Sequence, residues 1–241
     1  MLKIDPFNQG MTLRTGDSAP PLPQALSDRV DSIWKAEKLR RGDDLFDGRI
    51  FVIRKRGHRY IAGDFVNYRQ FLAQQLEPGL FESLKVCPLA VTGYTLCGDG
   101  VVIGKRSSQV TQDAGVWELV PAGGVDDSAL RADGTIDLGK TLCTELFEEI
   151  GIPTRALAAA PRPFVIIEDT ASHVVDIGLC VKVDLSAKQV VSMFQQSRHR
   201  EYTKLDVIEP DVELKAEPPL APVSRAIFEF ARQADFQGLK G

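Results

Sequence analysis

The sequence predicts an α/β protein, in the broad sense that includes α+β folds, because runs of strand-forming residues alternate with amphipathic helical segments. The chain has 241 residues, of which 44% are hydrophobic and 26% charged, and its formal net charge is −4. This apolar fraction is typical of globular proteins and offsets the entropy lost when the chain becomes ordered. We therefore expect a folded, soluble protein of one large or two small domains.

Charge and cysteine content narrow the classes of function. An acidic balance without a long Lys/Arg run disfavours a duplex nucleic-acid binder, whose affinity depends on neutralised phosphates. The four cysteines include no Cys-x-x-Cys pair, so we expect reduced thiols and no zinc site. No stretch approaches the roughly 20 apolar residues that span a bilayer, and the first residues lack the apolar core of a signal peptide. The expected protein is cytoplasmic, with no nucleic-acid and no membrane partner.

Residues 1–85 are expected to form a small amino-terminal α/β extension. Clustered prolines that end at Pro23 predict an extended lead-in. Apolar residues at helical spacing predict a helix over 26–39, with Ser27 and Asp28 offering the N-cap. The other expected elements are two strands, at 49–54 and 59–62, joined by a basic hairpin tip that is expected to be solvated, and a short helix at 67–76.

Residues 86–241 are expected to form the second unit. A helix over 138–150 has apolar residues at helical spacing, and Gly151 is a suitable C-cap. The Asp-rich stretch 125–134 is interpreted as an exposed loop. The other expected elements are strands at 89–96, 101–105, 117–120, 164–168 and 174–183, and helices at 186–195 and 224–233.

Three carboxylates lie within one turn of the predicted 138–150 helix. Glu145, Glu148 and Glu149 stand at positions i, i+3 and i+4, which share one helix face. Like charges so placed repel each other by about 0.2–0.5 kcal/mol per pair, which suggests a counterion. Carboxylate oxygens suit Mg²⁺ or Mn²⁺, whose shell is usually completed by water and substrate phosphates. The alternative is an acidic helix face that is merely solvated.

The surrounding sequence resembles a known family motif. Residues 144–152 follow a predicted strand and the Pro-Ala-Gly-Gly segment 121–124, and together they resemble the second half of the Nudix box. The resemblance implies a Nudix α/β/α sandwich with a mixed sheet. It also implies cleavage of a diphosphate link with Mg²⁺, or with Mn²⁺, held by Glu145, Glu148 and Glu149.

The sequence departs from the family pattern at three places. Thr144 stands where the family has an arginine that orients neighbouring carboxylates, and Ile136 occupies the place of the first glutamate, with Asp137 one position away. Several extra residues, roughly 126–134, precede the helix. The metal-ligand half is intact, so the resemblance implies an enzyme, with a Nudix-fold ligand sensor that has lost turnover as the alternative.

A narrower resemblance concerns the substrate. Segments 46–48, 67–72, 184–190 and 199–201 are similar to stretches of the animal Nudix proteins that hydrolyse UDP-glucose and UDP-galactose. That group also has an insertion in the Nudix box and lacks the arginine. The resemblance implies a UDP-sugar substrate that gives UMP and a sugar 1-phosphate, with ADP-ribose and other nucleotide diphosphate derivatives as rival substrates.

Further residues are candidates for the site. Glu201 is expected to act as a further metal ligand or general base beside Glu148 and Glu145, the alternative being an ordinary surface residue. Arg106 is a candidate for phosphate binding through its guanidinium, the alternative being a solvated strand end. The oligomeric state stays open, with a homodimer as one alternative. The remaining candidates are Gly123 and Gly124, whose backbone allows a ligand to approach closely, and Phe65, Tyr68 and Phe71, among which the sequence does not select a cover for uracil.

Overall fold

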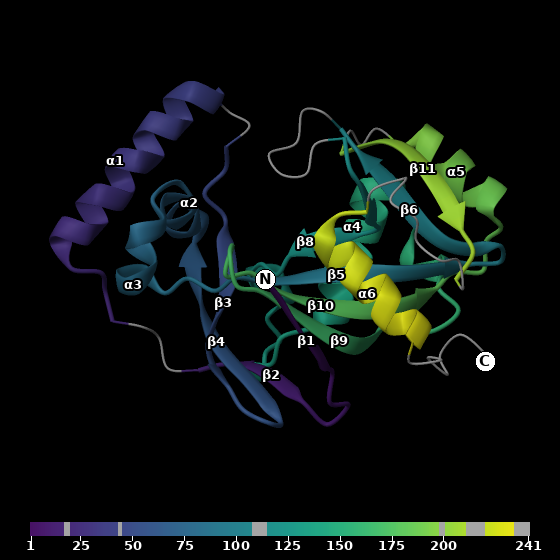
Figure 1. Cartoon of the computed structure of the whole chain (residues 1–241), viewed down its shortest axis with the longest axis horizontal. Helices are drawn as coiled ribbons and strands as arrows, with labels where there is room; N and C mark the ends of the chain where they lie inside the picture. The colour runs from purple at the N-terminus through teal and green to yellow at the C-terminus, as the bar shows by residue number, and fades with distance from the viewer. Residues whose placement is uncertain (17–19, 43–44, 108–114, 198–200, 211–219, 234–241) are drawn as a thin grey trace.

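The computed structural model describes residues 1–16, 20–42, 45–107, 115–197, 201–210 and 220–233. In this part of the chain a large mixed sheet lies between helices, and a smaller sheet with its own helices lies beside it (Figure 1). The predicted α/β class with a mixed sheet is confirmed.

The large sheet has eight strands among the described residues, in the order β1-β9-β10-β5-β6-β11, with β7 paired to β6 and β8 paired to β5. Neighbouring β10 and β5 are parallel, and the other pairs are antiparallel. The strands are β1 (Leu2–Pro6), β5 (Leu89–Cys97), β6 (Gly100–Arg106), β7 (Trp117–Leu119), β8 (Ala122–Gly124), β9 (Arg162–Asp169), β10 (Val175–Lys182) and β11 (Tyr202–Ile208).

Helices cover both faces of the large sheet. Because successive side chains of a strand point to opposite faces, Val91 of β5 packs in the core under α4 (Leu138–Ile150) and α5 (Ala187–Gln196). Tyr94 of the same strand packs against Phe228 of α6 (Pro222–Gln233) on the other face. Figure 1 shows α6 in front of the sheet and α4 and α5 behind it. The layers are therefore helix, sheet and helix.

The small sheet has the order β2-β4-β3 and packs against three helices. Three isolated bridges between described residues join it to the large unit, from Arg14 to Thr135, from Ile50 to Asp126 and from Val52 to Pro88. Its elements are β2 (Thr12–Thr15), α1 (Gln24–Arg41), β3 (Arg49–Arg56), β4 (Tyr60–Asn67), α2 (Tyr68–Leu76), the 3-10 turn η2 (Pro78–Leu80) and α3 (Phe81–Leu84).

The amino terminus differs from the expected extended lead-in. Residues 2–6 form β1, which pairs with β9 of the large sheet, and residues 12–15 form β2, which pairs with β4. The first strand therefore lies outside the small unit, although the predicted boundary near residue 85 places it there. The predicted N-cap of α1 is wrong, because the helix begins at Gln24 after Pro23 without a side-chain cap.

Two features of the second unit differ from expectation. Val125 and Ala129 are fully buried, so the stretch 125–134 is only partly exposed and contains the 3-10 turn η3 (Asp127–Ala129). The strand β11 was not predicted. The helix over 138–150 is confirmed: the side chain of Asp137 accepts the Lys140 N–H at 2.9 Å, and Gly151 ends the helix with φ 75°.

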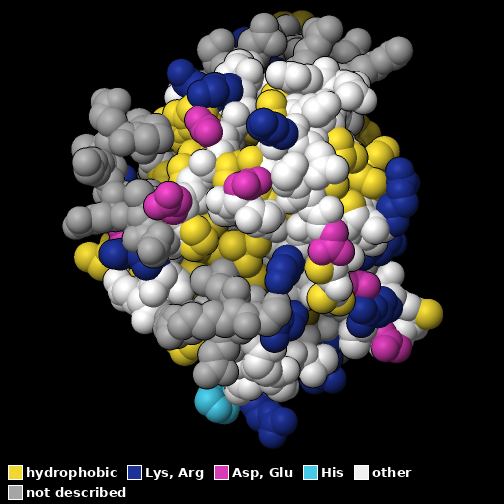
Figure 2. Space-filling view, turned by 90° about the vertical axis from the view of Figure 1, so that its right-hand side faces the viewer, with side chains coloured by type: hydrophobic (Ala, Val, Ile, Leu, Met, Phe, Trp, Pro, Cys, Tyr) yellow, Lys and Arg dark blue, Asp and Glu magenta, His cyan; other side chains and the backbone are white. Residues whose placement is uncertain are grey.

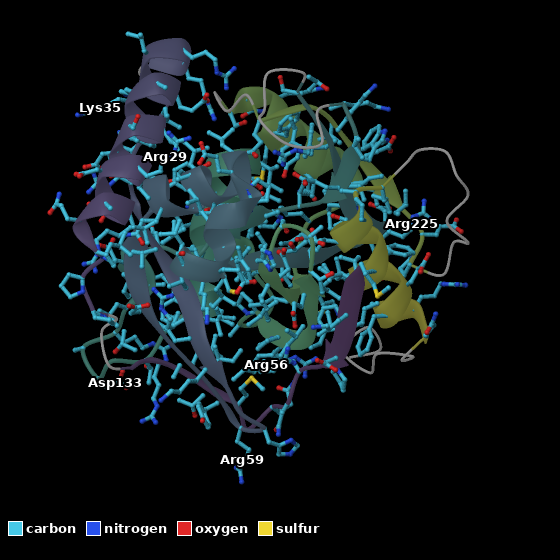
Figure 3. The ribbon with its side chains drawn as sticks, turned by 60° about the vertical axis from the view of Figure 1, so that its left-hand side comes forward. Arg29, Lys35, Arg56, Arg59, Asp133 and Arg225 are labelled. Carbon is cyan, nitrogen blue, oxygen red and sulfur yellow. The ribbon has the colours of Figure 1, made fainter. Side chains whose placement is uncertain are left out.

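Charged side chains of both signs lie on the surface among the described residues. Arg56 and Arg59 lie at the tip of the β3–β4 hairpin, and the Arg56 guanidinium pairs with Asp5 at 2.7 Å (Figure 3). On the face drawn in Figure 2, Lys and Arg lie interspersed with Asp and Glu. No helix within the described ranges is long and apolar enough to cross a membrane.

Candidate active site

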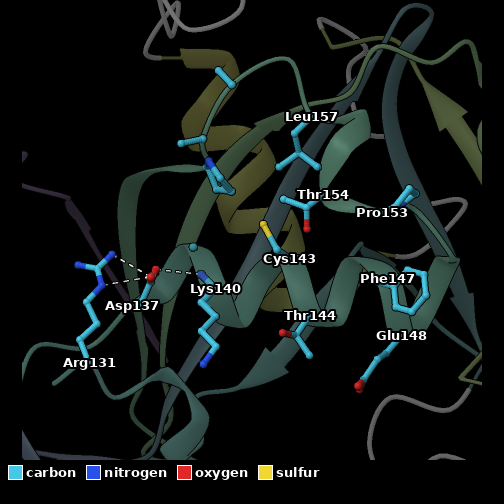
Figure 4. Close-up of a pocket in the computed structure, with 14 residues that line it drawn as sticks. Arg131, Asp137, Lys140, Cys143, Thr144, Phe147, Glu148, Pro153, Thr154 and Leu157 are labelled. Carbon is cyan, nitrogen blue, oxygen red and sulfur yellow. Dashed lines mark hydrogen bonds and ion pairs between the residues drawn. The ribbon is translucent and has the colours of Figure 1, made fainter.

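Helix α4 places its three carboxylates at different depths. Glu149 is only 3% exposed and faces the sheet, Glu145 is partly buried, and Glu148 is exposed. Figure 4 shows Glu148 and Thr144 projecting from the same side of α4. The i, i+3, i+4 spacing therefore brings the three carboxylates to the carboxyl-terminal end of the helix. In exposure to solvent, Glu145 is intermediate between the buried Glu149 and the exposed Glu148.

Glu145 lies directly against the backbone of Gly123 in β8. A Cβ on Gly123 would lie 2.7 Å from Glu145 Cγ and would overlap the carboxylate group. Burial, together with the negative charges of Glu148, Glu201 and Asp126, raises the pKa of Glu145 to about 7. Gly123 thus admits the Glu145 side chain, whereas a Cβ on Gly124 would meet nothing within 4 Å.

Glu149 has one engaged and one orphaned oxygen. Its Oε2 accepts the Ala122 N–H at 3.2 Å and lies 3.4 Å from the Tyr202 hydroxyl. Its Oε1 is buried and has no hydrogen-bond partner among the described residues. Burial, reinforced by Glu201, Glu145 and Glu118, raises the pKa of Glu149 well above its ordinary value. A buried carboxylate oxygen without a donor is costly unless a proton or a cation satisfies it.

A second group of side chains holds Glu149 from the sheet side. The Tyr202 hydroxyl donates to Glu118 Oε1 at 2.7 Å, and the Arg106 guanidinium pairs with Glu118. Arg106 Nη1 also lies 3.3 Å from Glu201 Oε1. Burial raises the pKa of Glu118, although Arg106 acts in the opposite direction. These contacts form a chain from Glu149 through Tyr202, Glu118 and Arg106 to Glu201.

This arrangement brings most of the predicted site residues together. Glu145, Glu149, Glu201, Arg106 and Gly123 surround one region at the junction of α4, β8 and β6. Carboxylates engage Arg106 here, so its phosphate-binding role stays a prediction. Of the segment 199–201, only Glu201 lies within the described residues.

Sequence reasoning missed Glu118 and Tyr202. Glu118 lies three residues before the predicted Pro-Ala-Gly-Gly turn, and this proximity is the one signal that pointed to it. Tyr202 directly follows the candidate Glu201, but its contact with α4 depends on the pairing of β11 with β6.

The donor set fits a hard divalent cation such as Mg²⁺. It offers carboxylate oxygens only, one of them buried without a partner among the described residues. Burial and the negative charge of Glu201 both contribute to the raised pKa values of Glu145 and Glu149. Within the described ranges no group of three His, Cys, Asp or Glu closes around a metal position. Mg²⁺ is commonly held by one or two carboxylates plus water and substrate phosphates, so a closed cage is not required.

Cavities formed by the described residues lie beside the site and beside α4. A cavity of about 790 Å³ shares Glu118, Ala122, Gly123 and Glu201 with the site. A second, of about 560 Å³, lies beside Asp126 and is lined by Phe46 and Tyr68. A third, of about 920 Å³, lies on the outer side of α4 and includes Thr144, Phe147 and Glu148 (Figure 4).

The three aromatic candidates for a uracil cover differ in their surroundings. Phe65 packs edge-on against Phe51, with 5.3 Å between ring centroids, and Phe71 belongs to the core of the small unit. Tyr68 lines the cavity beside Asp126. Of the three, Tyr68 is therefore the one that lines this cavity.

No family model and no curated protein sequence matches the chain. Several solved structures are similar in fold. A MutT NUDIX hydrolase from Burkholderia pseudomallei is 18% identical, with a TM-score of 0.40, over 59% of this chain and 95% of that chain. The NUDIX domain of Shewanella oneidensis NrtR, complexed with ADP ribose, is 16% identical, with a TM-score of 0.42, over 66% and 97%.

A third similar structure is a bifunctional NMN adenylyltransferase/ADP ribose pyrophosphatase from Francisella tularensis, complexed with AMP and a Mn ion. It is 14% identical, with a TM-score of 0.40, over 61% of this chain and 41% of that chain. At these identities and TM-scores the similarities carry no functional argument.

Proposed function

We propose that the protein is a Nudix-type, Mg²⁺-dependent hydrolase that cleaves the diphosphate link of a nucleoside diphosphate derivative. The observation that carries this proposal is the orphaned, buried Oε1 of Glu149 beside Glu145 and Glu201. Buried carboxylates that lack a positively charged partner are stabilised by a bound cation. A cation held by few protein ligands keeps coordination positions open for phosphate oxygens.

The residues divide the work between binding and proton transfer. Glu145, Glu148 and Glu149 would hold Mg²⁺, which when bound neutralises the phosphates and lowers the pKa of a coordinated water. Glu201 accepts the proton of the attacking water. A bond forms between the water oxygen and one phosphorus, and the bond from that phosphorus to the bridging oxygen breaks. The second phosphate leaves with the bridging oxygen, and Gly123 keeps Glu145 close to the reacting group.

The proposed substrate is a UDP-sugar, which gives UMP and a sugar 1-phosphate. The resemblance of segments 46–48 and 67–72 to UDP-sugar-hydrolysing Nudix proteins supports it, and Tyr68 of the second segment lines the cavity beside Asp126. ADP-ribose and other nucleotide diphosphate derivatives are the rival substrates within the same reaction class. A homodimer is compatible with any of them.

One observation favours the sensor as a second candidate. Ile136 is 6% exposed and belongs to the core, so it supplies no ligand in place of the first glutamate of the family. The neighbouring Asp137 caps α4 and pairs with Arg131 at 2.8 Å, which occupies its carboxylate. A protein with fewer acidic ligands binds a phosphorylated ligand with slower turnover or with none.

The test is a product assay over a panel of candidate substrates. UDP-glucose, ADP-ribose, dinucleoside polyphosphates and nucleoside triphosphates are each incubated with Mg²⁺ and with Mn²⁺, and products are separated by chromatography. Metal-dependent cleavage of UDP-glucose to UMP and glucose 1-phosphate supports the proposal in full. Cleavage of ADP-ribose alone would keep the reaction class and make ADP-ribose the substrate in place of a UDP-sugar. Tight binding without cleavage would favour the sensor.

A further inference from the structure

The 790 Å³ cavity extends from the carboxylate site along the α6 face of the large sheet. Ala122, Gly123 and Glu201 form its boundary with the site. Its far side is built from Thr92 of β5 and Asp176 of β10, two strands that pair in parallel. A ligand whose diphosphate lay at the carboxylates would therefore extend one of its ends toward Asp176.

The polar lining of this cavity consists mainly of hydrogen-bond acceptors. Four carboxylates line it, and its guanidinium, Arg106, is paired with two of them, Glu118 and Glu201. A third, Asp169, accepts the Ala171 N–H at 3.0 Å and the Ser172 hydroxyl at 2.7 Å. Such a lining repels phosphate and carbonyl oxygens and favours groups that donate O–H or N–H.

Asp176 is the carboxylate of this lining that can accept further hydrogen bonds. The Thr92 hydroxyl donates to its Oδ1 at 2.8 Å, and this is its one hydrogen bond among the described residues. Burial raises the pKa of Asp176 to about 6, so its charge is poorly compensated by the surrounding protein. A carboxylate fixed by one hydroxyl and open at the other oxygen is suited to accept hydrogen bonds from a ligand.

The cavity contains no aromatic ring among the described residues that line it. A nucleobase would have no surface for stacking there, whereas the cavity beside Asp126 has Phe46 and Tyr68 together with Arg41 and Arg49. The two cavities therefore differ in chemistry. The acceptor-lined cavity suits a hydroxyl-rich group, and the aromatic cavity suits a base.

We propose that the cavity lined by Thr92 and Asp176 binds the sugar end of the substrate, and that Asp176 is a specificity-determining residue that accepts hydrogen bonds from neighbouring sugar hydroxyls. The inference rests on the proposed function, because the diphosphate must lie at the α4 carboxylates for the sugar to extend into this cavity. It adds the sugar site and the residue that recognises the sugar.

The test compares ligands with and without the sugar. Calorimetric titration with Mg²⁺ measures the Kd of UDP-glucose and UDP, and of ADP-ribose and ADP, in a Glu148→Gln background that slows turnover. Asp176→Ala is expected to raise the Kd of at least one sugar-bearing ligand by about tenfold or more, since it removes a hydrogen bond to a charged group. UDP and ADP are expected to change by less than about twofold. Thr92→Val, which leaves the carboxylate but removes its orienting hydroxyl, is expected to weaken the same ligand by a smaller factor.

The outcomes separate this inference from the proposed function. Three results overturn the sugar site: Asp176→Ala leaves every Kd unchanged, it weakens the binding of ligands with and without the sugar equally, or neither sugar-bearing ligand binds. Absence of cleavage by the unmodified protein, with a sugar-dependent effect of Asp176→Ala on binding, overturns the hydrolase and leaves the sugar site supported. If Asp176→Ala lowers the unfolding midpoint, Asp176→Asn and Thr92→Val give the same comparison in folded protein.

Discussion

The side chain of Glu145 rests on the backbone of Gly123, so that no side chain fits between α4 and β8 at this point. Gly123→Ala must displace the Glu145 carboxylate or separate the helix from the strand. Because a displacement of about 1 Å at a reacting centre can cost a hundredfold in rate, we expect kcat to fall by about a hundredfold. Steady-state assays of the substrate identified by the panel measure this.

Gly124→Ala is the matched control for that experiment. The added methyl group meets nothing within 4 Å, and Gly124 is not among the glycines with positive φ, so we expect activity within about twofold of the unmodified protein. Equal loss in both variants would mean that the turn itself, rather than the contact with Glu145, matters.

The hydroxyl of Tyr202 stabilises the protein as well as the site. Tyr202→Phe removes the donor to Glu118 Oε1 and leaves that buried carboxylate with Arg106 as its remaining side-chain partner in the described part of the chain. We expect the free energy of unfolding to fall by about 1–3 kcal/mol, the cost of a hydrogen bond to a charged group. Chemical denaturation measures this difference.

Tyr94→Phe offers a comparison within the same fold. The Tyr94 hydroxyl is buried without a hydrogen-bond partner among the described residues. Its removal is expected to leave the free energy of unfolding unchanged or to increase it, because no bond is lost. If the two variants were destabilised to the same extent, the Tyr202 contact with Glu118 would contribute nothing specific.

Stability should depend on pH through Glu145. Its pKa is about 7 in the folded protein against 4.5 ordinarily, so between these values the folded state holds a proton that the unfolded state has lost. Without divalent metal, the free energy of unfolding therefore decreases as pH rises from about 4.5 to 7, by roughly 1–3 kcal/mol from this group. Thermal unfolding in EDTA across this range measures the slope.

Glu145→Gln is the control for the pH effect. It removes the titrating group, and we expect a smaller decrease in stability over the same pH range, with the remainder contributed by groups such as Asp176, whose pKa is also raised, to about 6. Added Mg²⁺ is expected to reduce the slope in the unmodified protein, since it favours the ionised carboxylates. A slope identical in the unmodified protein and in Glu145→Gln would contradict a raised pKa of the partly buried Glu145.

The α4 helix could be predicted from sequence because its signals are local. Apolar residues at helical spacing and the terminal Gly151 lie within the same short segment, and the structure confirms both ends. The i, i+3, i+4 spacing likewise predicted that Glu145, Glu148 and Glu149 share one turn. It did not predict that Glu149 is buried while Glu148 is exposed, because depth depends on what packs against the helix.

Features that depend on distant segments were missed. The strand β1 exists because β9 lies beside it, and β11 because β6 does, although each pair is far apart in the sequence. The contact of Tyr202 with Glu118 and Glu149 joins three such segments, so no local pattern indicated it. For the same reason the spacing of residues along the sequence did not predict the acceptor-lined cavity at Asp176, which is built from distant segments.

The central claim is that α4 carboxylates hold a divalent cation for diphosphate cleavage, and Glu149→Gln tests it most directly. The change preserves size and removes a poorly compensated buried charge, so the fold is expected to be retained or stabilised.

Calorimetric Mg²⁺ binding and Mg²⁺-dependent turnover are measured together for the unmodified protein, Glu149→Gln and Glu148→Gln. We predict that Glu149→Gln binds Mg²⁺ at least about tenfold more weakly, and that both variants lose about a hundredfold or more in kcat. Unchanged Mg²⁺ affinity with full turnover in both variants would contradict the account.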